Sequence, residues 1–414
     1  MPPSTASGSG HVYERVLNGY AANVPPQRLE ALRNDERVSS IFEDTVEHKD
    51  AAPQTEKTAG KPSPSTNLQT MPSGILRIDA DASLTAAIHP KEGDDPNVDI
   101  AILDTGIDGR HGDLNVAGGY NCTGRNTNAW GDRNGHGTHV AGTAAAKDNG
   151  SGVVGVAPGA RLWAIKTLDG DGALSDHICG LDWITTQNSD SSTDNDIEVA
   201  NYSGGGEGSD SANCGRDLTK GPDDPGYIVD PRHHATCSMV EAGVVFVASA
   251  GNIRRDLAEQ QPATYNEVIA VTAIADYDGD WVLPKAPVPS GCTDQGDDDT
   301  AATFTNYAGK SDDHGHTIAA PGVCIRSTDK RGGYATASGT SMSSPHVAGT
   351  AALCIAGKQC VADPSEVMTN MAKLIGDAKT RNDTSAPYYG FAQAPSDPSD
   401  GAKYYGYLVT AKDY

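Results

Sequence analysis

Three polar residues that could together break a covalent bond stand at the ends of expected secondary-structure elements. Asp104 follows the apolar run VDIAIL, His136 lies in NGHGTHVAGT, and Ser341 lies in SGTSMSSPHVAG. Taken singly, each has an ordinary structural interpretation, as a turn-capping carboxylate, a surface histidine or a helix N-cap serine. Together they supply an orienting acid, a base and a nucleophile, the groups that nucleophilic catalysis requires.

The elements that must position these residues form an alternating pattern. Short apolar runs rich in β-branched residues alternate with helical patterns, which predicts an α/β fold with a mostly parallel sheet and helices on both faces. In that architecture, functional side chains gather at the carboxyl ends of the strands. Gly339 allows a sharp turn before Ser341, and we expect Pro345 in the first turn of the helix that follows. The expected strands span 98–103, 162–166, 197–202, 244–248 and 268–273, and the expected helices 139–146, 181–186 and 347–356.

Composition narrows the classes of partner. The 414 residues include 31 Lys and Arg against 55 Asp and Glu, a formal net charge of −24. Such a surface repels nucleic acid and anionic membranes, so we expect neither as a partner. The longest apolar runs, such as 244–250, are far shorter than the ~20 residues that cross a bilayer. The opening MPPSTASGSG lacks a charged and then apolar leader, so no signal peptide is expected in this chain.

The eight cysteines favour an oxidising compartment. The count is even and no C-x-x-C pair occurs, which argues for disulfides rather than a zinc ribbon or a redox motif. Buried free thiols are the alternative. Counting alone leaves 105 pairings open.

Four regions are expected along the chain. Residues 1–10 are small and polar and are predicted to be disordered, whereas 11–48 carry helix and strand patterns. Residues 49–68 are rich in Pro, Ser, Thr, Lys and Ala, a linker composition. Residues 69–414 form the large α/β domain.

The three segments DTGIDGRHGDL, NGHGTHVAGT and GTSMSSPHVAG resemble the signature segments of the subtilisin-like serine proteases, the subtilases. The order Asp, His, Ser also matches that family. The resemblance covers roughly residues 69–414 and implies a three-layer subtilisin-like fold and a secreted serine endopeptidase that cleaves polypeptides. It implies that Ser341 is the nucleophile, His136 the general base and acid, and Asp104 the group that orients the imidazole. Asn252, in VVFVASAGN, matches the side chain that donates to the oxyanion, with the backbone N–H of Ser341 as its partner.

The resemblance also implies a strand edge that pairs with the substrate backbone. Ser203, Gly204 and Gly205 match one side of it, and Gly172 to Leu174 would lie on the other. The family usually has a larger apolar residue where Gly204 stands. We therefore expect a broad preference for the residue before the cut.

Calcium is the cofactor that the resemblance implies, at a structural site of six oxygen ligands. The alternative is a glycine-rich turn without an ion, because the same residue types form turns. The implied ligands are the side chains of Gln69, Asp113 and Asn149 and the backbone carbonyls of Lys147, Ser151 and Val153.

Residues 11–48 resemble the second half of this family's inhibitor-type propeptide, which implies a zymogen. Its first strand and helix are expected to be missing, which places its chaperone and inhibitor role in question. Its tail would leave through Val46–Lys49, and maturation would cut between Lys49 and Leu68. The implied partners are thus polypeptide substrates and the chain's own propeptide, for a monomeric enzyme. Family likeness further implies the pairs Cys214–Cys237, Cys354–Cys360, Cys292–Cys324 and Cys122–Cys179.

Two other classes of function compete with a protease. A catalytically silent binding protein on the same fold would have no need of Asp104, His136, Asn252 and Ser341 together. A serine esterase would favour a G-x-S-x-G elbow, but the context GTSMS lacks the second glycine.

Overall fold

A computed structural model describes residues 9–49, 69–88, 95–189, 196–222, 224–280, 286–385, 389–395 and 403–414. The strands are β1 (Ser9–Tyr13), β2 (Gly19–Ala22), β3 (Val46–Lys49), β4 (Asp99–Asp104), β5 (Val116–Asn121), β6 (Arg161–Lys166), β7 (Leu168–Asp169), β8 (Asp171–Ala173), β9 (Val199–Tyr202), β10 (Gly204–Glu207), β11 (Val245–Ser249), β12 (Gln260–Gln261), β13 (Val268–Ala275), β14 (Thr300–Ala301), β15 (Thr317–Pro321), β16 (Ile325–Asp329), β17 (Gly333–Ala337) and β18 (Tyr407–Leu408). The helices are α1 (Pro26–Arg33), α2 (Ser73–Arg77), α3 (His136–Ala145), α4 (Leu174–Ser189), α5 (Pro231–Glu241), α6 (Thr340–Ala356) and α7 (Val367–Ser385). Short 3₁₀ helices lie at Ala80–Ala82, Asn213–Gly215, Leu257–Glu259, Ser311–His316, Lys330–Gly332 and Pro364–Glu366.

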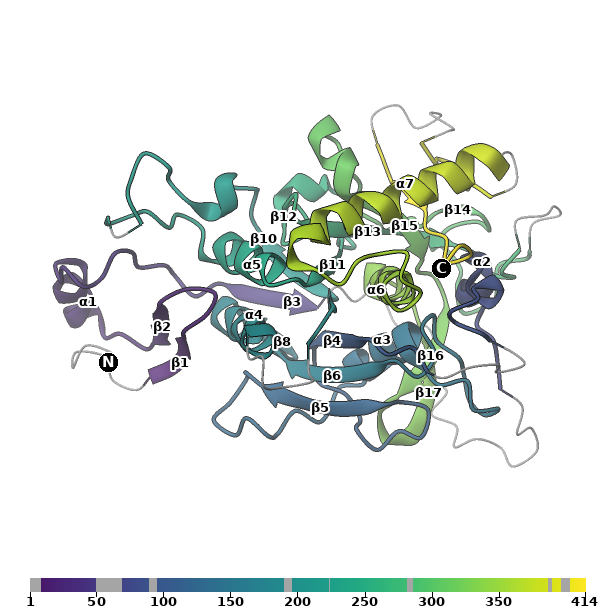
Figure 1. The fold of residues 1–414 in the computed structure, drawn as a ribbon, viewed down its shortest axis with the longest axis horizontal. Coiled ribbons are helices and arrows are strands. Elements are labelled where there is room, and N and C mark those ends of the chain that lie inside the picture. The colour runs from purple at the N-terminus through teal and green to yellow at the C-terminus, as the bar shows by residue number, and fades with distance from the viewer. Residues whose placement is uncertain are drawn as a thin grey trace.

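A large, mostly parallel sheet forms the core. Its order is β18-β15-β13-β11-β9-β4-β6-β5, and β14 adds an antiparallel pair to β13. All residues of β4, β11, β13 and β15 are buried, as expected for parallel strands covered on both faces. Helices α3 and α6 pack against each other and the sheet, while α4 packs on α5 and α7 covers β11 and β15 (Figure 1). The predicted three-layer α/β fold is confirmed.

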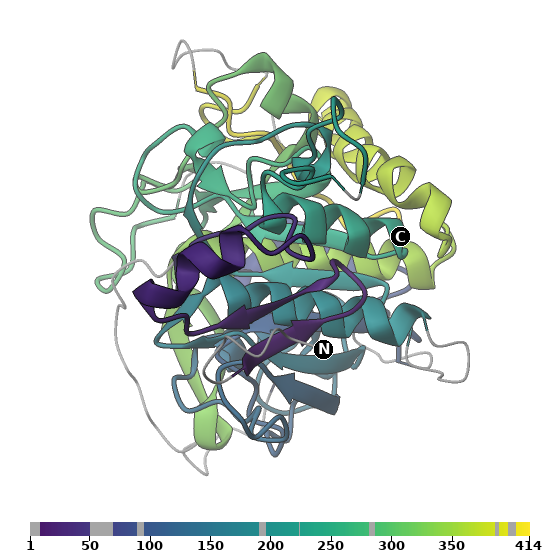
Figure 2. The same cartoon turned by 90° about the vertical axis from the view of Figure 1, so that its left-hand side faces the viewer.

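A second sheet joins the N-terminal segment to the main body. Its order is β12-β10-β3-β8-β7, so β3 lies between two strands that come much later in the chain. Figure 1 shows β1, β2 and α1 at one end of the molecule, with β3 reaching from them into the body. Seen from that end, these elements lie over the rest of the chain (Figure 2). β1 begins at Ser9, before the predicted boundary at residue 11, and residues 50–68 lie outside those described.

The eight cysteines form four disulfides, and all four predicted pairings are confirmed. A closed loop restricts the unfolded chain, by ~3 kcal/mol for 15 residues in the entropy model. The bonds are Cys122–Cys179, Cys214–Cys237, Cys292–Cys324 and Cys354–Cys360.

The helix behind Ser341 begins earlier than its apolar pattern indicates. Because α6 starts at Thr340, Pro345 lies inside the helix, and its expected position in the first turn is wrong. A proline at this point leaves the carbonyl four residues earlier without its helical partner. That carbonyl belongs to Ser341, and it accepts a hydrogen bond from Ser203 Oγ at 3.1 Å instead. The proline therefore frees a carbonyl that ties α6 to the end of β9.

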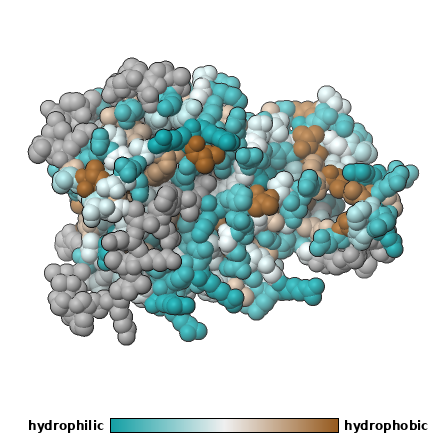
Figure 3. All heavy atoms as spheres, turned by 180° about the vertical axis from the view of Figure 1, so that it is seen from behind, coloured by the Kyte–Doolittle hydropathy of each residue, from teal (hydrophilic) through white to brown (hydrophobic). Residues whose placement is uncertain are grey.

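The surface carries its apolar side chains in separate small groups among hydrophilic ones on the face seen in Figure 3. Within the described residues, no helix is both long enough and apolar enough to span a membrane.

Candidate active site

Asp104 and His136 form a buried acid–imidazole pair. Asp104 is the last residue of β4, and His136 is the first residue of α3. His136 Nδ1 lies 2.8 Å from Asp104 Oδ1 and 2.9 Å from Oδ2. The other ring nitrogen, Nε2, is buried and has no hydrogen-bond partner among the described residues. The pair therefore holds one tautomer of the ring and leaves Nε2 for another group.

The turn before His136 is fixed by Asp132, which the sequence analysis did not single out. Its Oδ1 accepts hydrogen bonds from the N–H groups of Asn134 at 2.8 Å and Gly135 at 2.9 Å. Its Oδ2 accepts from the hydroxyl of Thr138 at 2.6 Å. Gly135 has a φ of 109°, a conformation that favours glycine. The signal for this turn was the run Asp-x-Asn-Gly, a typical side-chain-capped turn.

Two further histidines near α3 and α6 have other partners. His139 Nε2 contacts the Ile325 carbonyl at 3.0 Å, and burial, with the charge of His136 adding, lowers the pKa of His139 to about 4. His346 Nδ1 contacts the Met342 carbonyl at 2.8 Å, and burial lowers the pKa of His346 to about 4. Both are neutral near pH 7 and lack a carboxylate partner in these contacts. His136 thus differs from them in being oriented by an acid.

Ser341 stands at the start of α6 and exchanges hydrogen bonds with Ser203. Its Oγ donates to the Ser203 carbonyl at 3.3 Å, and Ser203 Oγ donates to the Ser341 carbonyl at 3.1 Å. Ser203 Oγ also lies 2.9 Å from Ser344 Oγ. The N–H groups at the first turn of a helix have no partner within it, so this end of α6 attracts negative charge.

Asn252 follows β11 and is oriented by α6. Its Oδ1 accepts from the N–H of Thr340 at 2.9 Å and from the Thr340 hydroxyl at 3.0 Å. Because the amide oxygen is used in this way, the amide N–H₂ points to the opposite side. Asn306 holds the loop, since its Oδ1 accepts from the N–H groups of Ile253 at 3.1 Å and Arg255 at 2.9 Å. Neither Thr340 nor Asn306 was identified from the sequence.

The predicted substrate edge is filled by β3. Gly204 pairs with Lys49 and Gly205 with His48 on one side, and Gly172 pairs with Glu47 on the other, all antiparallel. Leu174 extends this contact, because its N–H donates to the Thr45 carbonyl at 2.9 Å. The predicted residues Gly204, Gly205, Gly172 and Leu174 therefore flank one extended segment of this chain. Ser203 immediately precedes Gly204 and contacts Ser341 instead.

The glycine at 204 permits a close approach of two backbones. A Cβ there would lie 2.8 Å from the His48 carbonyl oxygen, and 3.2 Å from the Tyr202 ring. A larger residue would require both neighbours to shift.

Five of the six predicted calcium ligands lie in one set of contacts. Gln69 Nε2 donates to the carbonyl oxygens of Lys147 at 2.7 Å and Val153 at 3.1 Å. Asn149 Nδ2 donates to Asp113 Oδ1 at 3.2 Å, and the N–H of Val153 donates to Asp113 Oδ2 at 3.2 Å.

The donor chemistry of this cluster fits a hard cation. Two carbonyl oxygens converge on an amide N–H₂, a position that suits positive charge, and a carboxylate lies beside them. The oxygen and nitrogen of an amide such as Gln69 exchange by a simple flip. Ser151 contacts the cluster through its N–H and hydroxyl, which donate to Asn149 Oδ1 at 3.0 and 2.8 Å.

Comparison with known proteins agrees with this arrangement. The subtilase family model matches residues 95–387, and the peptidase inhibitor I9 model matches residues 4–49. Subtilisin NAT of Bacillus subtilis subsp. natto is 32% identical over 346 residues, which cover 82% of this chain and 71% of that protein. Subtilisin DY of Bacillus licheniformis is 34% identical over 319 residues, covering 75% and 94%. Subtilisin BL of Lederbergia lenta is 36% identical over 287 residues, covering 69% and 84%.

The second sheet combines strands from both matched ranges, since β3 lies in the N-terminal match and its neighbours β8 and β10 lie in the main match. The chain belongs to the subtilase family of serine endopeptidases and carries an inhibitor I9 propeptide domain.

Proposed function

We propose that this protease cleaves peptide bonds with Ser341 as nucleophile, His136 as general base and then acid, and Asp104 as the orienting carboxylate. The observation that carries the proposal is the position of β3. This segment lies as an extended strand between β10 and β8, next to the Ser203 carbonyl that Ser341 Oγ contacts. A substrate strand in the same place would bring its carbonyl to Ser341.

The chemistry follows from the position of each group. His136 Nε2 takes the proton of Ser341 as its oxygen attacks the carbonyl carbon, and gives that proton to the amine as the C–N bond breaks. A water molecule then attacks the acyl group on Ser341 in the same way, which releases the acid and restores the hydroxyl. Asp104 stabilises the imidazolium that forms between these steps. The carbonyl oxygen becomes an oxyanion, which the amide of Asn252 and the backbone N–H of Ser341 stabilise.

Hydrolysis of unfolded casein tests this proposal. A serine-directed phosphonyl or sulfonyl fluoride should block it and should label Ser341. Casein hydrolysis that such a reagent leaves unchanged would contradict the serine mechanism.

The I9 domain acts as an inhibitor in this proposal, because β3 takes the place of the substrate. Other contacts hold the domain on the body. Asp44 accepts from the N–H and hydroxyl of Ser175, at 2.8 and 2.7 Å, and so caps the start of α4. Asp182 Oδ1 accepts from the N–H groups of Glu14, Arg15 and Val16, at 3.1, 2.7 and 3.0 Å. The maturation cut is proposed between residues 49 and 68.

We further propose a broad preference for the residue just before the cut, since Gly204 presents no side chain there. Secretion accords with the four disulfides, because such bonds persist in oxidising compartments. A monomer is the proposed state.

Calcium is proposed as a structural cofactor held by Gln69, Asp113 and Asn149, with the Lys147, Ser151 and Val153 carbonyls. The ion would neutralise the Asp113 carboxylate and tie the segment around Gln69 to the loop after α3. Its role would be stability rather than chemistry at Ser341.

Removal of calcium should therefore lower the thermal midpoint of the protein. An ion held at 100 times its dissociation constant contributes ~2.7 kcal/mol by mass action. We expect EDTA to lower the midpoint and added calcium to restore it, as measured by differential scanning calorimetry on the fluoride-inhibited enzyme. Asp113→Ala should abolish the calcium response, whereas Asp312→Asn, at an exposed carboxylate, should retain it. A thermal midpoint that the chelator leaves unchanged would contradict the proposal that calcium binds at this site.

A further inference from the structure

One side chain of the inhibitory strand is buried, and it is an acid. Glu47 is 0% exposed, whereas its neighbours Val46 and His48 are exposed. Its Oε1 forms an ion pair with Arg232 of α5, and its Oε2 accepts from the Tyr202 hydroxyl at 3.0 Å. Burial of a carboxylate is costly unless charge and hydrogen bonds compensate it. The body of the protease thus provides both compensating groups.

The space for the Glu47 carboxylate exists because residue 206 is a glycine. A Cβ at Gly206 would lie 3.1 Å from Glu47 Oε1 and 3.1 Å from Arg232 Nη2. Any larger residue there would crowd the ion pair. The ring centroids of His177 and Tyr202 lie 4.4 Å apart. Burial, and to a smaller extent the positive charge of Arg232, lowers the pKa of His177 well below its usual value. His177 is therefore neutral near pH 7, and Arg232 supplies the positive charge.

Arg232 is held in place by the protease body. Its Nη1 donates to Gln261 Oε1 at 2.8 Å. The helix that carries it begins at the Asp230 cap, which accepts from the N–H of His233 at 3.0 Å. The charged group therefore remains when the I9 domain leaves.

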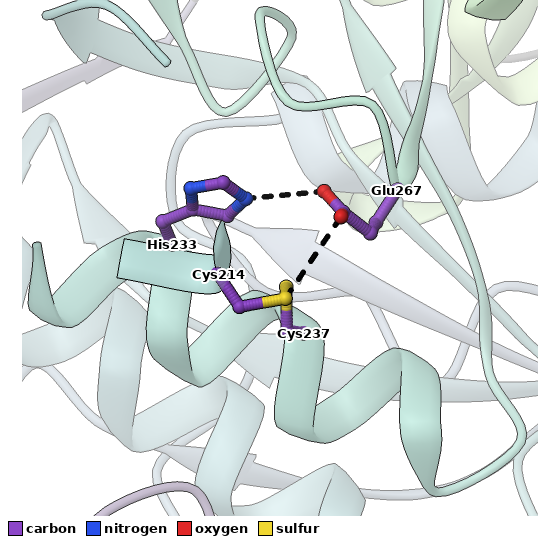
Figure 4. Close-up of side chains that lie close together, drawn as sticks. All are labelled: Cys214, His233, Cys237 and Glu267. Carbon is purple, nitrogen blue, oxygen red and sulfur yellow. Dashed lines mark hydrogen bonds and ion pairs between the residues drawn. A yellow bond between two sulfur atoms is a disulfide. The ribbon is translucent and has the colours of Figure 1, made fainter. Parts of the chain in front are cut away.

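Figure 4 shows how α5 is anchored beyond this cap. His233 Nε2 lies 3.1 Å from Glu267 Oε2, and Cys237 is bonded to Cys214. These four residues resemble a metal-ligand set, but the two sulfurs form a disulfide and offer no thiolate. The cluster therefore fixes the helix rather than binding an ion.

The register of β3 shows which residue of a bound substrate would place its side chain in this pocket. His48 pairs with Gly205 and Lys49 with Gly204, so the next residue of a bound substrate would lie opposite Ser203. The Ser203 carbonyl contacts Ser341 Oγ, which places the attacked carbonyl on that next residue. Counting back along the strand, the place of Glu47 belongs to the fourth residue before the cleaved bond.

We propose that Arg232, Tyr202 and Gly206 form an acid-selective pocket, so that the protease prefers glutamate at the fourth position before the cleaved bond. Arg232 is the residue that determines this specificity. The inference rests on the proposed function, since it takes β3 to occupy the substrate's place. An acidic side chain pairs with the buried guanidinium, whereas an apolar or basic one leaves its charge uncompensated.

The test compares four internally quenched peptides that differ only at this position, carrying Glu, Gln, Leu or Lys. With the mature enzyme we expect kcat/KM to fall in that order, with Glu above Leu by about tenfold or more. Burial raises the pKa of Glu47, and the charge of Arg232 opposes that rise. Because Gln can form hydrogen bonds but carries no charge, the Gln peptide separates recognition of the charge from a plain hydrogen bond. Equal rates for Glu and Gln would overturn recognition of the charge, and equal rates for all four would overturn the pocket.

Arg232→Met should reduce the ratio of Glu to Leu cleavage by about tenfold or more, while Arg110→Met, at an exposed arginine, should leave it unchanged. Arg232→Met also removes the ion-pair partner of Glu47 in the precursor. A second variant therefore combines Arg232→Met with Glu47→Met, so that two apolar side chains occupy the pocket of the precursor. An unchanged ratio in both variants would overturn the role of Arg232. Ratios within one enzyme do not depend on how much of it is active.

Failure of this inference is distinguishable from failure of the proposed function. A preparation that digests casein but shows no preference among the peptides, or leaves the Glu peptide intact, contradicts the pocket alone. A preparation that digests neither casein nor any peptide contradicts both.

Discussion

Ser341→Ala should fold and yet lose proteolysis, with a fall in casein hydrolysis of at least about 10⁴-fold. The side chain loses one oxygen, and the hydrogen bond from Ser203 Oγ to the backbone of residue 341 is retained. The same variant should fail to cut itself between residues 49 and 68, because in the proposed function one nucleophile performs both reactions. Casein hydrolysis and the mass of the purified chain are the two measurements.

Ser343→Ala is the matched control for this change. Ser343 lies on the same helix and is fully buried, and its Oγ has no hydrogen-bond partner among the described residues. It should mature and digest casein like the unchanged protein. Casein cleavage that persists in purified Ser341→Ala protein would refute the assignment of the nucleophile.

The parts of the structure that the sequence predicted well are those that local pattern or family likeness constrains. The run before Asp104 is apolar and β-branched, and it forms the buried strand β4. The disulfides were identified through the family, because spacing alone left every pairing open.

Helix starts were predicted less well, for a physical reason. α6 begins at Thr340 and α3 at His136, each within a segment whose small and polar residues give no apolar period. These first turns are stabilised by tertiary contacts such as the one from Ser203 to the Ser341 carbonyl. Local propensity does not contain that information.

The contacts that orient the site come from residues far apart in the chain. Glu47 and Arg232 are separated by 185 positions, and a lone arginine in a helix is more often a solvated residue than a buried one. Thr340 and Asn306 are likewise ordinary polar residues until the fold brings them beside Asn252 and its loop. Their roles could be found only from the three-dimensional arrangement.

Asn252→Leu should lower kcat by ~100–1,000-fold while KM changes little, the size expected when one hydrogen-bond donor to an oxyanion is removed. Leucine is close to asparagine in size but cannot donate a hydrogen bond. In the proposed function the amide acts only when the oxyanion forms, because the planar carbonyl oxygen carries less charge. The backbone N–H of Ser341 remains, so activity should not vanish. Michaelis–Menten kinetics on one peptide substrate provide the measurement.

A second variant separates donation by Asn252 from its orientation. Thr340→Val removes the hydroxyl that donates to Asn252 Oδ1 at 3.0 Å but keeps the backbone N–H that donates to it at 2.9 Å. We therefore expect kcat to fall less than in Asn252→Leu, again with little change in KM. Asn128→Leu, at an exposed asparagine, should change neither constant. If Asn252→Leu instead raised KM about tenfold with kcat unchanged, Asn252 would act in binding the ground state, and another group would have to stabilise the oxyanion.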